Sequence, residues 1–215
     1  MRENPRMKTR IAAVVFDLGG VLIDWNPEYL YRKIFTTEEQ MRDFLSSVCT
    51  LEWNEQQDEG RPIKEGTDLL IRHFPHYEHQ IRAYYDRWEE MLGGPIKETV
   101  AILRRLKDSG VPLYALTNWS AETYPIALER YDFLGWFDGV VVSGRERDRK
   151  PYPSFYRTLI KRYGLSATET LFIDDNARNV AGAIEAGLHA IHFRSPEQLD
   201  EALGDYALAG SALGR

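Results

Sequence analysis

The feature that most constrains the fold is a short apolar run near the N-terminus that ends in an acidic turn. Residues 11–16 read Ile-Ala-Ala-Val-Val-Phe, and Asp17-Leu-Gly-Gly follows them directly. A continuous apolar run of this length, rich in β-branched residues and closed by a turn, is typical of a strand buried on both faces of a parallel sheet. The run therefore indicates a sheet whose two faces are both covered.

Four further runs of this kind alternate with helical patterns through the C-terminal two thirds of the chain. The alternation predicts an α/β fold with a Rossmann-like parallel sheet as its core. The predicted strands are Pro112–Leu116, Gly139–Val142, Thr170–Ile173 and His189–Phe193, and the predicted helices are Lys97–Ser109, Ala121–Tyr131, Pro153–Tyr163, Ala177–Ala186 and Pro196–Leu203.

The stretch 25–93 has a different character. It contains no strand-like run, and its aromatic, Glu, Gln and Arg residues recur at helical spacing. This pattern predicts an all-helical cap domain inserted after the first strand, with Gly93-Gly94-Pro95 as a hinge back into the core. The core then comprises 8–24 and 94–205. The Gly- and Ala-rich tail 206–215 is expected to be loosely ordered.

Charge and cysteine content exclude several classes of partner. The formal net charge is −6 for 215 residues, which makes bulk attraction to nucleic acid or to an anionic membrane unfavourable. Cys49 is the only cysteine, so no internal disulfide can form, in keeping with a reducing compartment. No apolar stretch has the length of a signal-peptide core or a membrane span. We expect a cytoplasmic protein, either a monomer or a homodimer.

Polar side chains follow the ends of four predicted core strands. Asp17 follows the first, Thr117-Asn118 follows the second, Lys150 lies shortly after the third, and Asp174-Asp175 follows the fourth. Each taken alone is well explained as a turn former, a helix cap or a solvated lysine. Because ligands of an open parallel sheet bind beyond the carboxyl ends of its strands, the set as a whole predicts one site.

The residue types indicate phosphate chemistry at that site. Three carboxylates brought together repel one another unless a cation joins them, and hard oxygen ligands suit Mg²⁺. A lysine, a threonine hydroxyl, an asparagine amide and backbone N–H groups can hold phosphate oxygens. A carboxylate ionised at neutral pH can itself attack phosphorus and form an aspartyl-phosphate.

Four segments resemble the motifs of the haloacid dehalogenase superfamily in order and spacing, over nearly the whole chain. They are Val14-Val-Phe-Asp17-Leu-Gly-Gly-Val-Leu, Leu116-Thr117-Asn118, Arg149-Lys150-Pro151, and Phe172-Ile-Asp174-Asp175-Asn176 with Asn179. The helical insertion resembles the cap domain that this superfamily carries after its first motif. The similarity is greatest to small phosphatases acting on sugar phosphates, whose first motif reads DLGN or DLGG.

The resemblance implies a role for each matching position. Asp17 would be the nucleophile, and Thr117 with the Asn118 backbone would hold the phosphoryl oxygens. Lys150 would pair with Asp17 and the phosphate. Asp17, Asp175 and the Gly19 carbonyl would bind Mg²⁺, with Asp174 as a further carboxylate, direct or through water. The Gly19-Gly20 turn would contribute to substrate binding, and Asn179 would steady the site.

One position departs from the family pattern. Most phosphatases of the superfamily carry an Asp two residues after the nucleophile, where it protonates the leaving group, and this chain has Gly19 there. General acid catalysis is typically worth about 10²–10⁴-fold. The departure leaves three explanations: a lower rate, a cap residue or water that supplies the proton, or a substrate with a better leaving group. A hexose 1-phosphate would suit the third explanation. Asp24 is interpreted as the start of the linker into the cap.

The resemblance leaves two other functions open. A metal-free 2-haloacid dehalogenase uses the same nucleophile, but it has no clear need for the pair Asp174-Asp175. A non-catalytic protein that binds a small phosphorylated metabolite would explain the missing acid, but it has no need for a nucleophile. Candidates to line the entrance are Trp25, Trp53, the turn Glu59-Gly60-Arg61 and Trp119.

Overall fold

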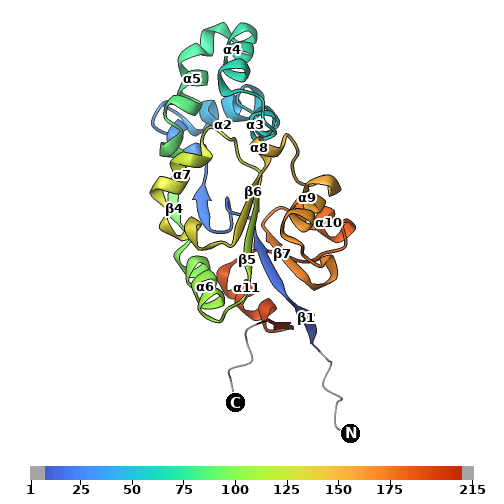
Figure 1. The fold of residues 1–215 in the computed structure, drawn as a ribbon. Coiled ribbons are helices and arrows are strands. Elements are labelled where there is room, and N and C mark those ends of the chain that lie inside the picture. The colour runs from blue at the N-terminus through green and yellow to red at the C-terminus, as the bar shows by residue number, and fades with distance from the viewer. Residues whose placement is uncertain (1–7, 210–215) are drawn as a thin grey trace.

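A five-stranded parallel sheet forms the centre of the protein in a computed structural model that describes residues 8–209 (Figure 1). Strand β2 is the middle strand and pairs in parallel with β5 and β7. The predicted α/β fold with a parallel core is confirmed. Across the sheet the order is β6 (Gly139–Val142), β5 (Leu113–Thr117), β2 (Ala13–Phe16), β7 (Thr170–Asp174) and β8 (His189–His192).

Helices cover both faces of the sheet, as Figure 1 shows. Phe16 of β2 belongs to the apolar cluster that includes Leu103 of α6 and Leu199 of α11. Val15 instead belongs to a second cluster, with Phe155 of α9 and Ala183 of α10. The alternation along β2 therefore buries both of its faces. The helices of this core are α6 (Lys97–Asp108), α7 (Tyr124–Arg130), α8 (Ser143–Glu146), α9 (Pro153–Tyr163), α10 (Ala177–Glu185) and α11 (Pro196–Leu203), with the 3-10 turns η3 (Asp132–Trp136) and η4 (Ala167–Glu169).

A layer of helices, which we call the helical cap, stands at one end of the sheet (Figure 1). Aromatic side chains fill its interior: the ring centroids of Tyr31 and Phe44 lie 5.0 Å apart, and those of Trp53 and Tyr84 lie 5.1 Å apart. Its elements are α1 (Glu28–Tyr31), α2 (Glu38–Ser47), α3 (Leu51–Asp58), α4 (Ile63–His73), η1 (Pro75–Tyr77), α5 (Glu78–Asp86) and η2 (Trp88–Met91).

Two short strands join the cap to the core. β3 (Ile23–Trp25) and β4 (Leu92–Pro95) pair in antiparallel fashion, so Gly93-Gly94-Pro95 lies in a paired strand. Glycine and proline disfavour strands, so this pairing could not be predicted from residues 93–95. We propose the predicted boundaries, 25–93 for the cap and 8–24 with 94–205 for the core, as the domain organisation of the chain.

The prediction of a loosely ordered tail from residue 206 is wrong for its first residues. Tyr206–Leu208 form β9, which pairs in parallel with β1 (Thr9–Ile11). Tyr206 and Leu208 also pack against the larger apolar cluster, and this burial orders them. The rest of the predicted tail, 210–215, lies outside the described residues. Within 8–209, no helix combines the length and apolar character needed to cross a membrane.

Candidate active site

The carboxyl ends of β2, β5 and β7 lie next to one another, because β2 pairs with both neighbours. Asp17 follows β2 directly, Thr117 is the last residue of β5, and Asp174 is the last residue of β7. All three side chains are buried. The strand order therefore places these polar groups, which are distant in sequence, at one edge of the sheet.

Lys150 joins two of the carboxylates. Its Nζ lies 2.8 Å from Asp17 Oδ2 and 2.7 Å from Asp174 Oδ2, and the residue is only 1% exposed. Burial by itself would lower the pKa of this lysine, but the two carboxylates outweigh burial and raise its pKa. The ammonium group therefore stays charged in the interior and holds Asp17 in place.

The Asp17 carboxylate is oriented at both oxygens. Oδ1 accepts a hydrogen bond of 2.7 Å from the Leu18 backbone N–H, and Oδ2 faces the Lys150 ammonium. Burial raises the pKa of Asp17; Lys150 opposes this rise, while the charges of Asp174 and Asp175 add to it. The group is thus a fixed carboxylate in an acidic cluster that a further cation would stabilise.

Asp174 is fully occupied by protein donors. Oδ2 accepts from Lys150 Nζ and from Asn179 Nδ2 at 3.1 Å, and Oδ1 accepts from Asn179 Nδ2 at 3.0 Å and from Asn176 N–H at 2.8 Å. A carboxylate offers about four acceptor positions, so these four bonds fill the acceptor positions of Asp174. Asp174 therefore orients Lys150 and the start of α10, and Asn179 supports it.

Asn118 fixes the backbone that carries Lys150. Its Oδ1 accepts from the Lys150 N–H at 2.9 Å, and its Nδ2 donates to the Lys150 carbonyl at 3.1 Å. The Asn118 side chain is thus engaged with the protein itself, which leaves its backbone N–H as the group it can offer to a ligand. This pair of bonds locks the end of β5 to the segment before α9.

Three acidic side chains are close enough to share one cation. Asp17, Asp174 and Asp175 each offer a carboxylate oxygen, and these oxygens all lie within 4.8 Å of one another. An octahedral Mg²⁺ with ligands at about 2.1 Å separates its oxygens by roughly 3–4 Å. The donor set is hard oxygen throughout, so it fits Mg²⁺ after a small adjustment of the side chains.

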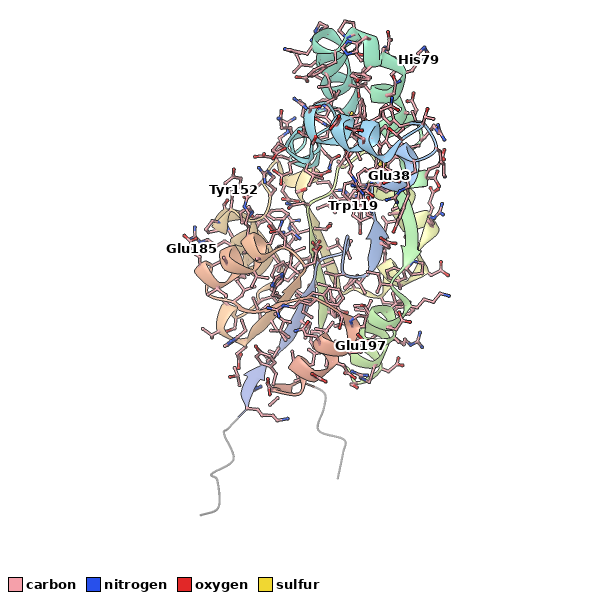
Figure 2. All side chains as sticks on the ribbon, turned by 180° about the vertical axis from the view of Figure 1, so that it is seen from behind. Glu38, His79, Trp119, Tyr152, Glu185 and Glu197 are labelled. Atoms are coloured by element: carbon pink, nitrogen blue, oxygen red, sulfur yellow. The ribbon has the colours of Figure 1, made fainter. Side chains whose placement is uncertain are left out.

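A pocket that is partly open to solvent lies next to this cluster, and Gly19 and Asn118 are among its lining residues. Trp88 and Trp119 form part of its wall, with ring centroids 5.6 Å apart. Figure 2 shows Trp119 between the sheet and the helical cap. The core contributes the polar floor, and the cap helps to form the walls. The lining residues are Gly19, Trp25, Asn54, Asp58, Tyr85, Trp88, Asn118, Trp119 and Thr123.

Most of the chain matches a known protein family. A family model described as haloacid dehalogenase-like hydrolase matches residues 11–187. The chain belongs to the haloacid dehalogenase-like hydrolases. The matched region includes all four segments that carry the acidic cluster, Thr117 and Lys150. The chain is therefore a hydrolase.

Individual relatives agree with this assignment. The hydrolase is 30% identical over 196 residues to the sesquiterpene phosphatase astK of Aspergillus oryzae, an alignment that covers 86% of this chain and 91% of astK. It is 23% identical to a phosphoglycolate phosphatase of Aliivibrio fischeri, over 84% of this chain and 82% of that protein. The crystal structure of the HAD family enzyme bt-2542 from Bacteroides thetaiotaomicron has the same fold, with a TM-score of 0.69, 21% identity, and coverage of 90% of this chain and 98% of that one. The bt-2542 enzyme has also been solved in complex with magnesium and inorganic phosphate.

The residues predicted to line the entrance of the hydrolase separate into two groups. Trp25 and Trp119 line the pocket. Trp53 does not: its Nε1 donates to the Gly66 carbonyl at 3.2 Å inside the cap. The turn Glu59-Gly60-Arg61 directly follows the lining residue Asp58 but is not itself among the lining residues, and Glu59 pairs with Arg149 of the core at 3.1 Å.

Sequence reasoning missed four cap residues of the pocket, namely Asn54, Asp58, Tyr85 and Trp88. Asn54 and Asp58 are one helical turn apart on α3, at an i, i+4 spacing that would have placed them on one face. The sequence of α3 has no apolar stripe that would show which face of the helix is buried, because polar residues such as Gln57 are buried as well. Their position follows only from how the cap docks on the core.

Gly19 and Gly20 differ in whether a side chain could be added there. Gly20 has φ +72°, and a Cβ there would lie 2.3 Å from Asp175 Oδ2, whereas a Cβ on Gly19 would have no neighbour within 4 Å. We expect Gly20→Ala to lose about 1–3 kcal/mol of unfolding free energy and Gly19→Ala to change it by less than about 0.5 kcal/mol. Urea denaturation of both variants without added metal measures the difference. Equal stability of the two variants would contradict the close approach of Gly20 to Asp175.

Proposed function

We propose that this hydrolase is a Mg²⁺-dependent phosphomonoesterase that works through an aspartyl-phosphate on Asp17. The observation that carries this proposal is the contact of the buried Lys150 with both Asp17 and Asp174, which lie within 4.8 Å of an Asp175 carboxylate oxygen. A fixed carboxylate flanked by a lysine and a further acidic group suits attack on a dianionic phosphoryl group.

Each residue of the site has a place in this reaction. An Asp17 oxygen attacks phosphorus, and the bond from phosphorus to the ester oxygen breaks. Lys150, the Thr117 hydroxyl and the backbone N–H groups of Asn118 and Gly19 donate to the phosphoryl oxygens. The Gly20 N–H does not take part as predicted, because it already donates to the Ile23 carbonyl at 2.9 Å. A water then attacks phosphorus, and the bond to Asp17 breaks to release phosphate.

The metal would be held by Asp17, Asp175 and the Gly19 carbonyl. Asp174 would take part through a water, because protein donors already fill its acceptor positions. A bound Mg²⁺ supplies positive charge that offsets the repulsion between the carboxylates and the phosphoryl group. The magnesium and phosphate complex of the bt-2542 enzyme supports this proposal.

The pocket favours an apolar alcohol as the rest of the substrate. Its polar side chains are paired with each other: Tyr85 Oη donates to Asn54 Oδ1 at 2.9 Å, and Asn54 Nδ2 donates to Asp58 Oδ2 at 2.8 Å. Trp119 Nε1 likewise donates to the hydroxyl of Thr123 at 3.1 Å. The hydroxyls of a sugar would have to break these hydrogen bonds to form their own. The faces of the tryptophan rings can instead pack against a hydrocarbon chain without such competition.

We therefore favour a phosphate monoester with a hydrocarbon group over the predicted hexose 1-phosphate. The 30% identity to a sesquiterpene phosphatase supports this choice. The substrate is then still a small phosphorylated metabolite, but its phosphate is esterified to an apolar alcohol and not to a sugar.

A phosphate-release assay with farnesyl phosphate and glucose 1-phosphate tests the proposal. With Mg²⁺, we expect kcat/KM to be about tenfold or more higher for farnesyl phosphate, because only this substrate fills the aromatic pocket. With excess EDTA, we expect turnover of both to fall to background and to return when Mg²⁺ is restored. Full activity in EDTA would overturn the metal site, and a preference for the sugar phosphate would overturn the substrate class.

The same assay addresses the two other functions. Chloride release from 2-chloropropionate without Mg²⁺, together with no phosphate release, would favour the haloacid dehalogenase. Tight binding of a phosphate ester with no turnover in Mg²⁺ would favour the non-catalytic binding protein. The second outcome requires a binding measurement, such as calorimetry with farnesyl phosphate.

A further inference from the structure

The proposed reaction lacks a group that protonates the leaving oxygen. An alkoxide is a poor leaving group, so the ester oxygen needs a proton as its bond to phosphorus breaks. Gly19 occupies the position where the family usually has an Asp for this task, and it has no side chain. The donor must therefore come from another residue that faces the substrate.

Asp58 lines the same pocket from the cap. Among the residues that line the pocket in the described part of the chain, it alone carries a carboxyl group. It is the last residue of α3 in the helical cap, and Gly19 and Asn118 lie across the pocket in the core. A substrate whose phosphoryl group rests on the core side therefore presents its ester oxygen toward the cap side.

Three contacts hold Asp58 against the core. The Ser143 hydroxyl donates to the Asp58 carbonyl, and the Ser120 backbone N–H donates to the Asp58 carboxyl group. The neighbouring residue Glu59 pairs with Arg149 at 3.1 Å. Ser120 is three residues beyond Thr117, so the carboxyl group lies close to the segment that would hold the phosphoryl oxygens.

The surroundings of Asp58 keep a proton available near neutral pH. Burial raises the pKa of its carboxyl group to about 7, and the nearby Glu55 acts in the same direction. The Ser120 N–H, the Arg149 guanidinium and the Asn54 amide oppose the rise. Tyr84 and Tyr85, whose hydroxyls stay neutral, are the other titratable groups that face it. A general acid works best when its pKa lies near the working pH.

We propose that Asp58 is the catalytic proton donor of this hydrolase, an inference that rests on the proposed phosphatase function. As Asp17 attacks and the phosphorus–oxygen ester bond breaks, the proton of the Asp58 carboxyl group moves to the leaving oxygen. The alcohol departs neutral, and Asp58 remains as a carboxylate. The Asp58 carboxylate then takes a proton from the water that attacks the aspartyl-phosphate, which restores both acids to their starting states.

The test compares Asp58→Asn with the wild type on two esters of similar size. Benzyl phosphate has a poor leaving group, and p-nitrophenyl phosphate has a good one that needs no proton. We expect kcat/KM, which reports the steps up to formation of the aspartyl-phosphate, to fall on the order of 10²-fold or more on benzyl phosphate and less than about threefold on p-nitrophenyl phosphate. The wild type should also lose kcat/KM on benzyl phosphate as pH rises through about 7, because the acid deprotonates, and the variant should lack this fall.

The control is Asp43→Asn, the same change on an exposed position of α2, with thermal unfolding measured for every variant. The control should behave as the wild type on both esters. An equal loss of kcat/KM on the two esters in a folded Asp58→Asn variant, or an unchanged pH profile of kcat/KM, would overturn the role of Asp58 as the proton donor. If the wild type hydrolysed neither ester with Mg²⁺, the proposed function would fail before the role of Asp58 was reached.

Discussion

Replacing Asp17 with asparagine is expected to lower kcat on the order of 10⁴–10⁶-fold, with phosphate release near background. An amide is a poor nucleophile, so no aspartyl-phosphate can form. Asn keeps an oxygen to accept the Leu18 N–H, which bonds to Asp17 Oδ1 at 2.7 Å, and the side-chain shape is preserved. The loss therefore reports on chemistry. A phosphate-release assay with farnesyl phosphate and Mg²⁺ measures it.

The fold of Asp17→Asn should survive the change. Lys150 keeps its partner Asp174 at 2.7 Å, so no buried charge is left without a counter-charge. The exposed change Asp43→Asn serves as the control and should keep full activity. If a folded Asp17→Asn variant retained half of the wild-type rate, Asp17 would not be the nucleophile.

Replacing Lys150 with methionine is expected to cost about 3–5 kcal/mol of unfolding free energy when no metal is present. The ammonium group lies 2.8 Å from Asp17 and 2.7 Å from Asp174 and is buried with them. Its removal leaves two adjacent carboxylates in the interior without their cation. Methionine preserves most of the side-chain length, so the loss comes from charge more than from packing. Urea denaturation in EDTA measures it.

Two comparisons make the Lys150 prediction specific. Lys161→Met, on the exposed side of α9, should change stability by less than about 0.5 kcal/mol. Added Mg²⁺ should recover part of the stability of Lys150→Met, because the metal supplies a cation to the same carboxylates. A loss below about 1 kcal/mol would show that Lys150 does not balance the acidic cluster.

The sequence was sufficient to predict the acidic edge of the sheet. Asp17 and Asp174 each lie at the carboxyl end of a buried strand, and the carboxyl ends of neighbouring parallel strands lie at the same edge of the sheet. The pairing of Lys150 with Asp17 was implied by the family resemblance, whereas its contact with Asp174 was not predicted. What the sequence did not indicate is that Asn118 uses its side chain on the Lys150 backbone and that Asp174 has no free acceptor position.

The cap side of the pocket was less predictable for a physical reason. Asn54 and Asp58 face the pocket because Ser143, Ser120 and Arg149 of the core hold the end of α3, and such contacts between distant segments leave no local pattern. The short pairings β1–β9 and β3–β4 were missed for a similar reason. Each involves strands of only three or four residues, too short to show a period.

The most direct test of the mechanism is mass spectrometry of the protein quenched in acid during turnover of farnesyl phosphate with Mg²⁺. We expect the peptide that contains Asp17 to gain the mass of one phosphoryl group in the wild type and to remain unmodified in Asp17→Asn. The Asp58→Asn variant should retain the modification with p-nitrophenyl phosphate as substrate. Wild-type turnover with no phosphorylated peptide, or with the phosphoryl group on a residue other than Asp17, would contradict the aspartyl-phosphate mechanism.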